Sequence, residues 1–387
     1  MSGELANTGK ILIYQNEKGD TKIDVYFEDD TIWMAQRSMA ELYQVTPQNI
    51  TTHIKHIYED GELEQEPTCK SCLQVQMEGT RQIRRDIKFY NLDMILAVGG
   101  GSVIDTAKAI AIGVPYDGDF WDFFSGKVPE QALPVGTVLT IAASGSEGSP
   151  DSIITNEKTL EKNGAEADCL RPCFSVLDPA LTESLPAYQT ACGITDIMAH
   201  TFERYFTNTP DVEVTDRMLE GVLLAMLHEG RRVMEDPHNY EARANIMWAG
   251  MVCHNDIMGV GRQQDWNSHH LEHVLSAKYD CAHGAGLAVI HPVLYRHIYK
   301  SGAARFARFA QNVWGIAPKG SDEETAAAGI DALAAFIKEI GLLTTFTELG
   351  IPADTDFRAI ADSTNVTAGC CKKLTHDEIC EILQECL

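Results

Sequence analysis

Four histidines fall within fifteen residues in the second half of the chain, and no other feature constrains the fold as strongly. His269 and His273 are four residues apart, so on a helix they share one face. His283 stands directly before Gly284, and a glycine there suits a turn or a close backbone approach. Neutral imidazole is the commonest side-chain metal ligand, while a helix with solvated histidines is the alternative. The cluster by itself leaves both interpretations open.

A second pair of polar residues favours metal binding. Asp196 and His200 are also four apart, and they lie in the apolar run 191–206, which predicts a buried helix. A carboxylate and an imidazole that face a core are costly unless they are paired or bind a cation. Two helices can therefore build a site of one aspartate and three histidines. Such a mixed nitrogen and oxygen set suits Fe or Zn, and it also accepts Ni or Mn.

A glycine-rich segment follows the apolar strand pattern at 94–98. Residues 99–102 read Gly-Gly-Gly-Ser and lead into a helical pattern over 103–111. A strand, a glycine turn and a helix together form a cradle for phosphate, because backbone N–H groups at a helix start attract anions. A plain tight turn is the alternative. A second loop at 143–147 follows a predicted strand at 134–142 and adds hydroxyls and backbone donors.

Three charged residues lie near these loops. Lys162 lies between predicted strands at 153–156 and 174–178, where it could reach a phosphate, although most exposed lysines have no specific role. Asp105 and Lys108 lie beside the glycine turn, and a place on the helix surface is the alternative interpretation for both.

Composition narrows the class of protein. A net charge of -25 argues against broad nucleic-acid affinity. The eleven cysteines are odd in number and irregularly spaced, which is typical of reduced thiols, and the lone pair Cys69 and Cys72 is weak evidence for zinc. No apolar run is long enough to span a membrane, and the residues from Met1 onward do not show the charged-then-apolar pattern of a leader. We therefore expect a cytoplasmic protein with no membrane contact.

From residue 191 onward the sequence predicts an almost wholly helical region. The periodic segments are 214–232, 240–258, 292–313, 325–340 and 376–387. We expect three domains, at 1–93, 94–187 and 188–387. The expected fold class is α/β plus all-α: a truncated Rossmann-like nucleotide domain, then an all-helical metal-binding domain, preceded by a small α+β helix-turn-helix-like domain. A ligand would bind in the cleft between the nucleotide and helical domains.

Residues 1–93 show the pattern of a helix-turn-helix module. Strand patterns at 11–14, 23–27 and 31–33 precede a helical pattern at 39–43, a turn at 45–47 and a second amphipathic helix at 48–57. The outward polar residues of the second helix suit base edges and phosphates. The acidic segment 59–66 favours the alternative, an ordinary helical hairpin.

The N-terminal segment resembles the RhuM family of virulence-associated proteins from Ile11 to about Val98. The shared motifs are Lys22-Ile-Asp-Val, Met39-Ala-Glu-Leu, Asn49-Ile-Thr-Thr-His-Ile-Lys, Asp60-Gly-Glu-Leu and Phe89-Tyr-Asn-Leu-Asp-Met-Ile. This resemblance implies a DNA-binding module rather than an enzyme.

From about residue 94 the chain resembles the iron-containing alcohol dehydrogenase family, in its branch of butanol dehydrogenases and aldehyde reductases. The motifs occur in family order: Gly99-Gly-Gly-Ser-Val-Ile-Asp105, Ala143-Ser-Gly-Ser-Glu147, Leu177-Asp-Pro, Gly193-Ile-Thr-Asp196-x3-His200, Asp265-Trp-x2-His269-x2-Glu-His273 and Ala282-His283-Gly-Ala-Gly286. The resemblance implies reversible hydride transfer between a short-chain primary alcohol and NAD or NADP, with a divalent metal as Lewis acid. It also implies a homodimer.

The resemblance assigns roles to individual residues. The implied metal ligands are Asp196, His200, His269 and His283. His273 would lie beside the nicotinamide as a proton relay, and Asp105 near the nicotinamide ribose or the substrate. The implied cofactor-binding residues are Gly100, Gly101, Ser102, Thr140, Ser144, Gly145 and Lys162.

One departure from the family concerns the start of the nucleotide domain, where the RhuM-like segment stands instead. The seam lies within 93–99, a string that fits either parent. A parallel sheet that lacks several strands exposes an apolar face and an edge. Our hypothesis is that the metal site forms while dinucleotide affinity is poor. The alternatives to the family activity are a catalytically impaired fusion whose N-terminal module binds DNA and a helical metal-binding domain that only dimerises.

Overall fold

The computed structural model describes most of the chain, in two compact units. The described residues are 10–15, 22–28, 31–42, 48, 51, 54–55, 69–78, 81–91, 94–367 and 371–387. The first unit is Met1–Ile95 and the second is Leu96–Leu387, so the division falls within the 93–99 segment where the sequence analysis placed the seam.

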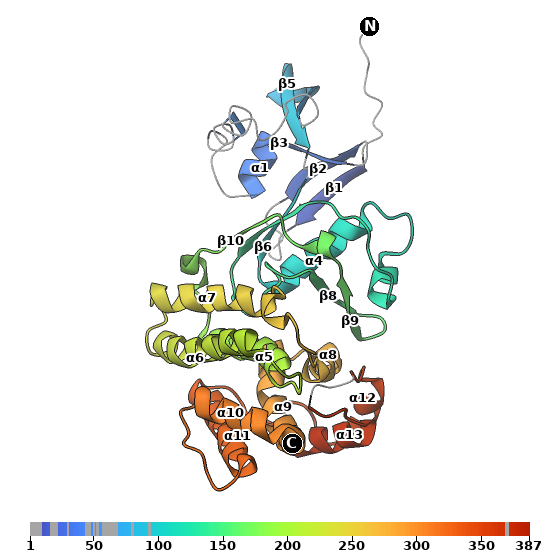
Figure 1. Ribbon diagram of the computed structural model, residues 1–387. Coiled ribbons are helices and arrows are strands. Elements are labelled where there is room, and N and C mark those ends of the chain that lie inside the picture. Colours follow the sequence, from blue (N-terminus) through green and yellow to red (C-terminus); the bar gives the residue numbers. More distant parts are fainter. Residues whose placement is uncertain are drawn as a thin grey trace. The chain divides into compact units, whose positions relative to one another are not determined.

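The first unit contains a five-stranded sheet in the order β1-β2-β3-β5-β4, with every neighbouring pair antiparallel (Figure 1). Its elements are β1 (Lys10–Gln15), β2 (Lys22–Glu28), β3 (Thr31–Ala35), α1 (Gln36–Leu42), β4 (Cys69–Glu78) and β5 (Arg81–Asn91). The three predicted strands are confirmed, and β4 and β5 were not predicted. Cys69 and Cys72 both fall on β4. The predicted turn at 45–47 and most of the second helix at 48–57 lie outside the described residues.

The second unit begins with an α/β lobe. Its three-stranded sheet has the order β10-β7-β6, and β10 and β7 pair in parallel. Helix α4 packs on the antiparallel hairpin of β8 and β9 and on β7. The elements are β6 (Ile95–Gly99), α4 (Gly101–Gly113), η1 (Phe120–Ser125), β7 (Val135–Leu139), β8 (Asp151–Asn156), β9 (Glu161–Glu166), η2 (Asp168–Leu170), β10 (Phe174–Val176) and η3 (Pro179–Thr182).

The sheet of this lobe is small, as the sequence suggested. Leu96 and Val98 on β6 and Val103 on α4 are exposed apolar side chains. A short apolar strand of this kind is ordinarily buried on both faces of a parallel sheet. The strand predicted at 134–142 stops at Leu139, because residues 140–148 turn away to form the hydroxyl-bearing loop.

A helical lobe completes the second unit (Figure 1). Its elements are α5 (Ala187–Tyr205), α6 (Glu213–Glu235), α7 (Tyr240–His254), η4 (Ile257–Gly259), α8 (Asn267–Tyr279), α9 (His283–Ile298), η5 (Tyr299–Gly302), α10 (Ala303–Asn312), α11 (Asp322–Glu339), α12 (Phe357–Ser363) and α13 (His376–Glu385). The predicted order of an α/β lobe followed by an all-helical lobe is confirmed. Among the described helices, none has both the length and the apolar character needed to cross a bilayer.

One helix prediction was wrong. The sequence predicted a single helix over 292–313, whereas the structure has α9 and α10 separated by the short helix η5. Helix α9 starts nine residues earlier, at His283, and Pro292 lies inside it. Proline lacks a backbone N–H, so the pattern suggested a start there, but burial of the surrounding turns keeps the helix continuous.

Helix α5 is the centre of the helical lobe. Every residue from Thr190 to Tyr205 is buried, which is the predicted consequence of its continuous apolar run. Helices α6, α7 and α9 pack around it. Polar side chains on such a helix therefore lose their water on folding, and each needs a partner in the protein or a ligand.

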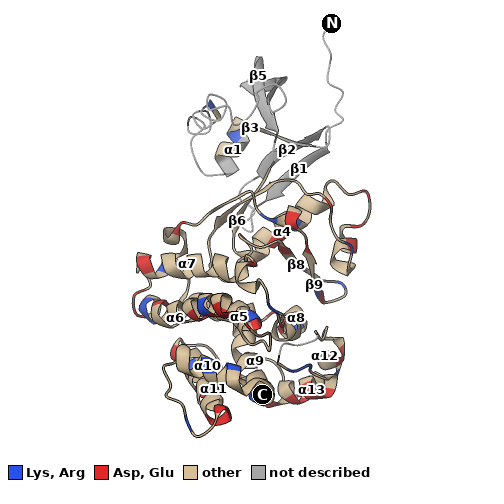
Figure 2. Ribbon diagram, viewed as in Figure 1, with Lys and Arg blue, Asp and Glu red and all other residues tan. Residues whose placement is uncertain are grey.

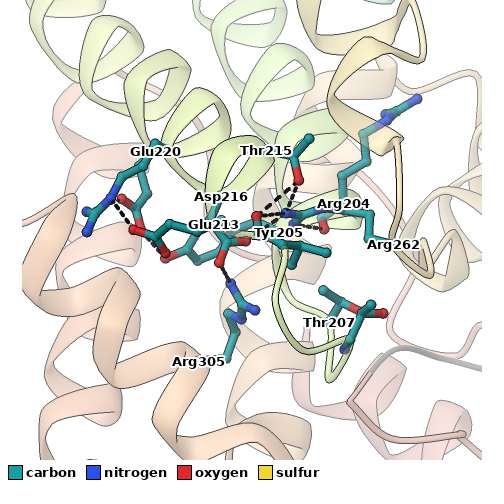
Figure 3. Close-up of polar contacts among 12 residues, drawn as sticks. Arg204, Tyr205, Thr207, Glu213, Thr215, Asp216, Glu220, Arg262 and Arg305 are labelled. Carbon is teal, nitrogen blue, oxygen red and sulfur yellow. Dashed lines mark hydrogen bonds and ion pairs between the residues drawn. The ribbon is translucent and has the colours of Figure 1, made fainter.

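The acidic residues are spread over many elements, including the outer turns of α6, α11 and α13 (Figure 2). Several carboxylates are buried instead, and Asp216 is one of them. Asp216 on α6 accepts from Arg262 at 2.7 Å and lies 2.5 Å from Arg305 and 3.2 Å from Arg308 (Figure 3). Arg262 also donates to the carbonyl of Arg204 at 2.8 Å. The network ties the end of α5, α6 and α10 to the loop that leads into α8.

We expect Asp216→Asn to destabilise the fold by about 3–5 kcal/mol, because three guanidinium groups would lose their shared buried carboxylate. The measurement is the free energy of unfolding in urea. Asp331→Asn is the matched control: it breaks the exposed pair of Asp331 with Arg296, and such a surface pair contributes less than about 1 kcal/mol. Equal effects of the two substitutions would contradict this account.

Candidate active site

A cleft of about 1180 Å³ lies between the α/β lobe and the helical lobe of the second unit. The α/β lobe contributes residues of α4, the 143–149 loop, β8 and β9 to its wall, and the helical lobe contributes residues of α5, α7, α8 and α9. Most of the polar residues identified in the sequence lie on this wall.

The four predicted metal ligands converge in this cleft. The Asp196 Oδ1 atom lies 3.3 Å from His200 Nδ1, 3.9 Å from His269 Nε2 and 3.7 Å from His283 Nε2. Asp196 and His200 come from one face of α5, His269 comes from α8, and His283 is the first residue of α9. One carboxylate oxygen is therefore surrounded by three imidazoles from three helices.

The chemistry of this group fits a divalent cation. Asp196 Oδ1 and His269 Nε2 are both buried and have no hydrogen-bond partner in the described part of the chain, which is costly without a ligand. Burial would raise the pKa of Asp196, but His200 and His283 outweigh it and lower that pKa to about 2. Burial, with the neighbouring imidazoles, lowers the pKa of His269 well below its ordinary value. An ionised carboxylate beside a neutral imidazole is the state in which both bind a metal.

Two buried glutamates that sequence reasoning did not assign contact the outer nitrogens of the imidazoles. Glu203 accepts from His269 Nδ1 at 2.8 Å, and Glu272 lies against His283 Nδ1. Burial, followed by the charge of Asp265, raises the pKa of Glu203 well above its ordinary value, so its ionised form needs a cation nearby. Glu272 and His273 are adjacent in the sequence, but the sequence did not indicate which of the two would contact a proposed metal ligand.

His273 lies beside the group without joining it. Its ring centre is 5.4 Å from that of His283 and 6.4 Å from that of His269. Burial, followed by the charge of Lys162, lowers the pKa of His273 well below the ordinary value. His273 also forms a second set of metal-ligating atoms with Glu272 and His283.

His254 is a further residue of the site that the sequence did not reveal. Its ring centre lies 4.3 Å from that of His200. Its Nδ1 accepts from Arg204 at 3.3 Å and its Nε2 donates to Asp151 at 3.1 Å, which joins the helical lobe to β8. His254 is the last residue of α7 and has no nearby motif partner, so only the tertiary structure identifies it.

The predicted cofactor-binding residues divide into two groups. Gly101, Ser102, Ser144 and Lys162 line the cleft, and Gly100, Thr140 and Gly145 do not. The second group shapes the loops instead. Gly100 is the N-cap of α4 and has no side chain, which leaves the start of the helix open. The backbone N–H of Thr140 donates to the carbonyl oxygen of Gly99 at 3.0 Å. Gly145 has a φ of +67°, and a Cβ there would lie 2.5 Å from the carbonyl oxygen of Gly250.

Asp105 lines the cleft and accepts from Ser146 at 2.6 Å, and burial raises its pKa to about 6. The surface interpretation of Lys108 is wrong. Its ammonium group is buried and donates to the carbonyls of Ser146, Ser149 and Asp151 at 2.7, 2.9 and 2.7 Å. Lys108 therefore holds the 146–151 segment against α4, which shapes one wall of the cleft.

Lys162 links the lobes as well as lining the cleft. It lies on β9, an element that sequence reasoning did not predict. Its Nζ donates to Ser276 on α8 at 2.9 Å and lies 3.8 Å from Glu272. The side chain thus reaches the back of the metal-ligand group.

Comparison with known protein families identifies the family to which this chain belongs. A sequence profile of iron-containing alcohol dehydrogenases matches residues 47–179, and a profile of the C-terminal part of the Fe-containing alcohol dehydrogenase family matches residues 190–387. The chain belongs to the iron-containing alcohol dehydrogenase family. This confirms the predicted family and enzyme class. The first match begins at residue 47, so it includes part of the segment that resembles the RhuM family.

Individual relatives place the chain among alcohol and aldehyde enzymes of this family. It is 42% identical over 305 residues to the probable NADH-dependent butanol dehydrogenase 2 of Bacillus subtilis, covering 77% of this chain and 78% of the relative. It is 36% identical over 269 residues to the NADPH-dependent aldehyde reductase YqhD of Escherichia coli, covering 68% of this chain and 69% of the relative. The crystal structure of NADH-dependent butanol dehydrogenase A from Thermotoga maritima superposes with a TM-score of 0.72 at 38% identity and 76% coverage of each chain.

We expect Gly284→Ala to destabilise the fold by about 1–3 kcal/mol, the range for overpacked interiors. A Cβ at Gly284 would lie 2.0 Å from the carbonyl oxygen of Cys192, so α9 would have to move away from α5. Gly221→Ala on α6 is the matched control, because nothing lies within 4 Å of its Cβ position. Gly221→Ala should stabilise the fold by up to about 1 kcal/mol, because alanine has a higher helix propensity than glycine. Urea unfolding measures both, and a stabilising Gly284→Ala would contradict the close contact.

We expect Glu147 by itself to lower the free energy of unfolding as the pH rises from 5.5 to 7, against the opposite contribution of buried histidines such as His254 and His291. Burial raises the pKa of this carboxyl from 4.5 to about 7 in the folded chain, so the folded state binds the proton more tightly than the unfolded state. Its contribution is therefore fully present below pH 4.5 and is lost as the pH rises to about 7. Glu147→Gln should remove a fall on the order of 2 kcal/mol over this interval, given about 1.4 kcal/mol per pH unit.

Urea unfolding at pH 5.5 and pH 7.5 measures this difference. The exposed Glu235→Gln on the last turn of α6 serves as the control. If the free energy of unfolding depended on pH in the same way in Glu147→Gln and in the control, the fall in stability could not be assigned to Glu147.

Proposed function

We propose that this enzyme transfers hydride reversibly between a short-chain primary alcohol of the butanol type and NAD or NADP. The observation that carries the proposal is the unpaired Asp196 Oδ1 with three imidazoles around it, in the same cleft as the open start of α4. The names of the related NADH-dependent butanol dehydrogenases and of the NADPH-dependent aldehyde reductase support the same reaction.

Asp196, His200, His269 and His283 are the proposed metal ligands. A divalent metal held there supplies a Lewis acid for the alcohol or carbonyl oxygen, and the dinucleotide supplies the hydride carrier. The four ligands include one anionic oxygen and three neutral nitrogens, which suits Fe, Zn, Ni or Mn. Asp196, His200 and His269 are buried, whereas His283 is partly exposed to the cleft.

The α/β lobe is the proposed dinucleotide side of the cleft. The N–H groups at the start of α4, in Gly101 and Ser102, attract a pyrophosphate because they have no partner within the helix. The Ser144 hydroxyl lies against this turn, since a Cβ on Gly101 would be 2.3 Å from Ser144 Oγ. Asp105, held by Ser146, would face the ribose or the substrate.

His273 is the proposed proton carrier. It lies beside the ligand group, and its depressed pKa keeps the imidazole neutral, so His273 would pass on a proton from the alcohol rather than hold it. Lys162 stands close enough to influence it electrostatically. His273 would then return the proton to the carbonyl oxygen in the reverse reaction.

Two further proposals concern the rest of the molecule. We propose that the enzyme forms a homodimer, as the family resemblance implies, and light scattering of the purified chain tests this. We also propose that residues 11–98 derive from a RhuM-like module joined to the enzyme, which would weaken dinucleotide binding because the sheet at β6 is small and has exposed Leu96 and Val98. The net charge of -25 does not favour a DNA-binding role for the chain.

The test of the proposed function is reduction of butanal by the iron- or zinc-loaded chain with NADH or NADPH, followed by absorbance of the reduced dinucleotide. We expect turnover that falls at least about 100-fold in Asp196→Ala, because an essential ligand is lost. A titration with the dinucleotide, followed by tryptophan fluorescence, measures dinucleotide binding separately from metal binding. Metal binding without dinucleotide binding would support the fusion hypothesis, and no turnover with either dinucleotide would overturn the proposed reaction.

A further inference from the structure

Two buried carboxylates stand behind two of the proposed metal ligands. Glu203 on α5 and Glu272 on α8 are both almost fully buried. Glu203 lies 2.8 Å from His269 Nδ1, and Glu272 contacts His283 Nδ1. Each carboxylate therefore meets the ring nitrogen that faces away from Asp196.

These contacts determine which nitrogen of each ring carries the proton. A neutral imidazole has one N–H, and a carboxylate that accepts from Nδ1 leaves Nε2 with a free lone pair. Nε2 is the atom that faces Asp196 in both residues, at 3.9 Å for His269 and 3.7 Å for His283. His200 also keeps a free lone pair on Nε2, because its Nδ1 lies 2.9 Å from the backbone carbonyl oxygen of Asp196 on the same helix.

The two carboxylates have different surroundings. Glu203 also accepts from the hydroxyl of Ser268 and from the His269 N–H, and both donors belong to the first turn of α8. Glu272 is 3.3 Å from Ser276 and 3.8 Å from the ammonium of Lys162. The charge of Glu272 is thus partly neutralised by Lys162. Among the described residues, Glu203 forms an ion pair with His269 and none with a lysine or arginine, although it feels the charge of Arg204.

We propose that Glu203 and Glu272 are positioning residues that set the divalent-cation affinity of the site by holding Nε2 of His269 and of His283 unprotonated and directed at Asp196. This inference rests on the proposed metal site. In this proposal neither glutamate is a ligand of the cation held by Asp196 and the three histidines. Because Lys162 already offsets one of the two charges, Glu203 contributes more to the affinity than Glu272 does.

The test is Zn²⁺ affinity of the full chain after removal of metal by a chelator, measured at pH 7.5 by competition with a chromophoric chelator. Glu203→Gln and Glu272→Gln keep the side-chain shape and remove the charge. We expect affinity to fall about 10–100-fold in each, the usual effect of losing an outer partner of a metal-binding histidine. The larger loss should be in Glu203→Gln. Glu235→Gln, exposed at the end of α6, is the control and should bind zinc as the unmodified chain does.

A second readout separates positioning from general damage to the fold. In the zinc-loaded protein, each Nδ1–H bonded to a carboxylate should give a downfield proton resonance in the NMR spectrum. Glu203→Gln should shift the resonance of His269 and leave that of His283, and Glu272→Gln should do the reverse. A substitution that only loosened the structure would alter both together.

The outcomes distinguish this inference from the proposed function. Zinc binding by the unmodified chain that is unchanged in both glutamine variants would overturn the positioning role and leave the metal site standing. Failure of the unmodified chain to bind one zinc ion, or equal binding by Asp196→Ala, would overturn the metal site and the positioning role together.

Discussion

The burial of Asp196 in the middle of α5 is the constraint on which the rest of the site depends. A carboxylate in a helix whose neighbours are all buried has lost its water, and its Oδ1 atom has no hydrogen-bond partner. Such a group destabilises the fold unless positive charge lies close to it. Three imidazole rings gather around that oxygen, which is the arrangement that a cation would complete. A buried carboxylate of the helical core is therefore the residue around which the site is assembled.

The surrounding structure holds the three ligand-bearing helices in register. Gly284 lets the first turn of α9 approach the carbonyl of Cys192 on α5, which brings His283 to Asp196. Arg262 joins the end of α5 to α6 just before α8 begins. Glu203 connects α5 to the first turn of α8 through His269. Tight backbone contact, a buried ion pair and a carboxylate–imidazole bond thus fix the same set of helices by different means.

The α/β lobe meets this assembly through polar contacts across the cleft. His254 with Asp151, Arg171 with Asp256 at 2.6 Å, and Lys162 with Ser276 each join one lobe to the other. Lys108 keeps the wall of the cleft in place from within the α/β lobe. The open start of α4 and the ligand group therefore face a common space, as hydride transfer between a dinucleotide and an alcohol requires.

The sequence alone determined the chemistry and the order of the parts. The spacing of four residues between Asp196 and His200 placed both on one face of a helix, the apolar run around them indicated burial, and the glycine turn at 99–102 marked the start of a helix. These are local properties, set by the period of a helix and by the conformational freedom of glycine. Only the tertiary structure revealed the place of His254, the partners of Lys108, and the contacts of Glu203 and Glu272 with the outer nitrogens of the proposed ligands. Those residues act through contacts between segments far apart in the chain, and one-dimensional spacing carries no information about which distant side chains will meet once the helices have packed.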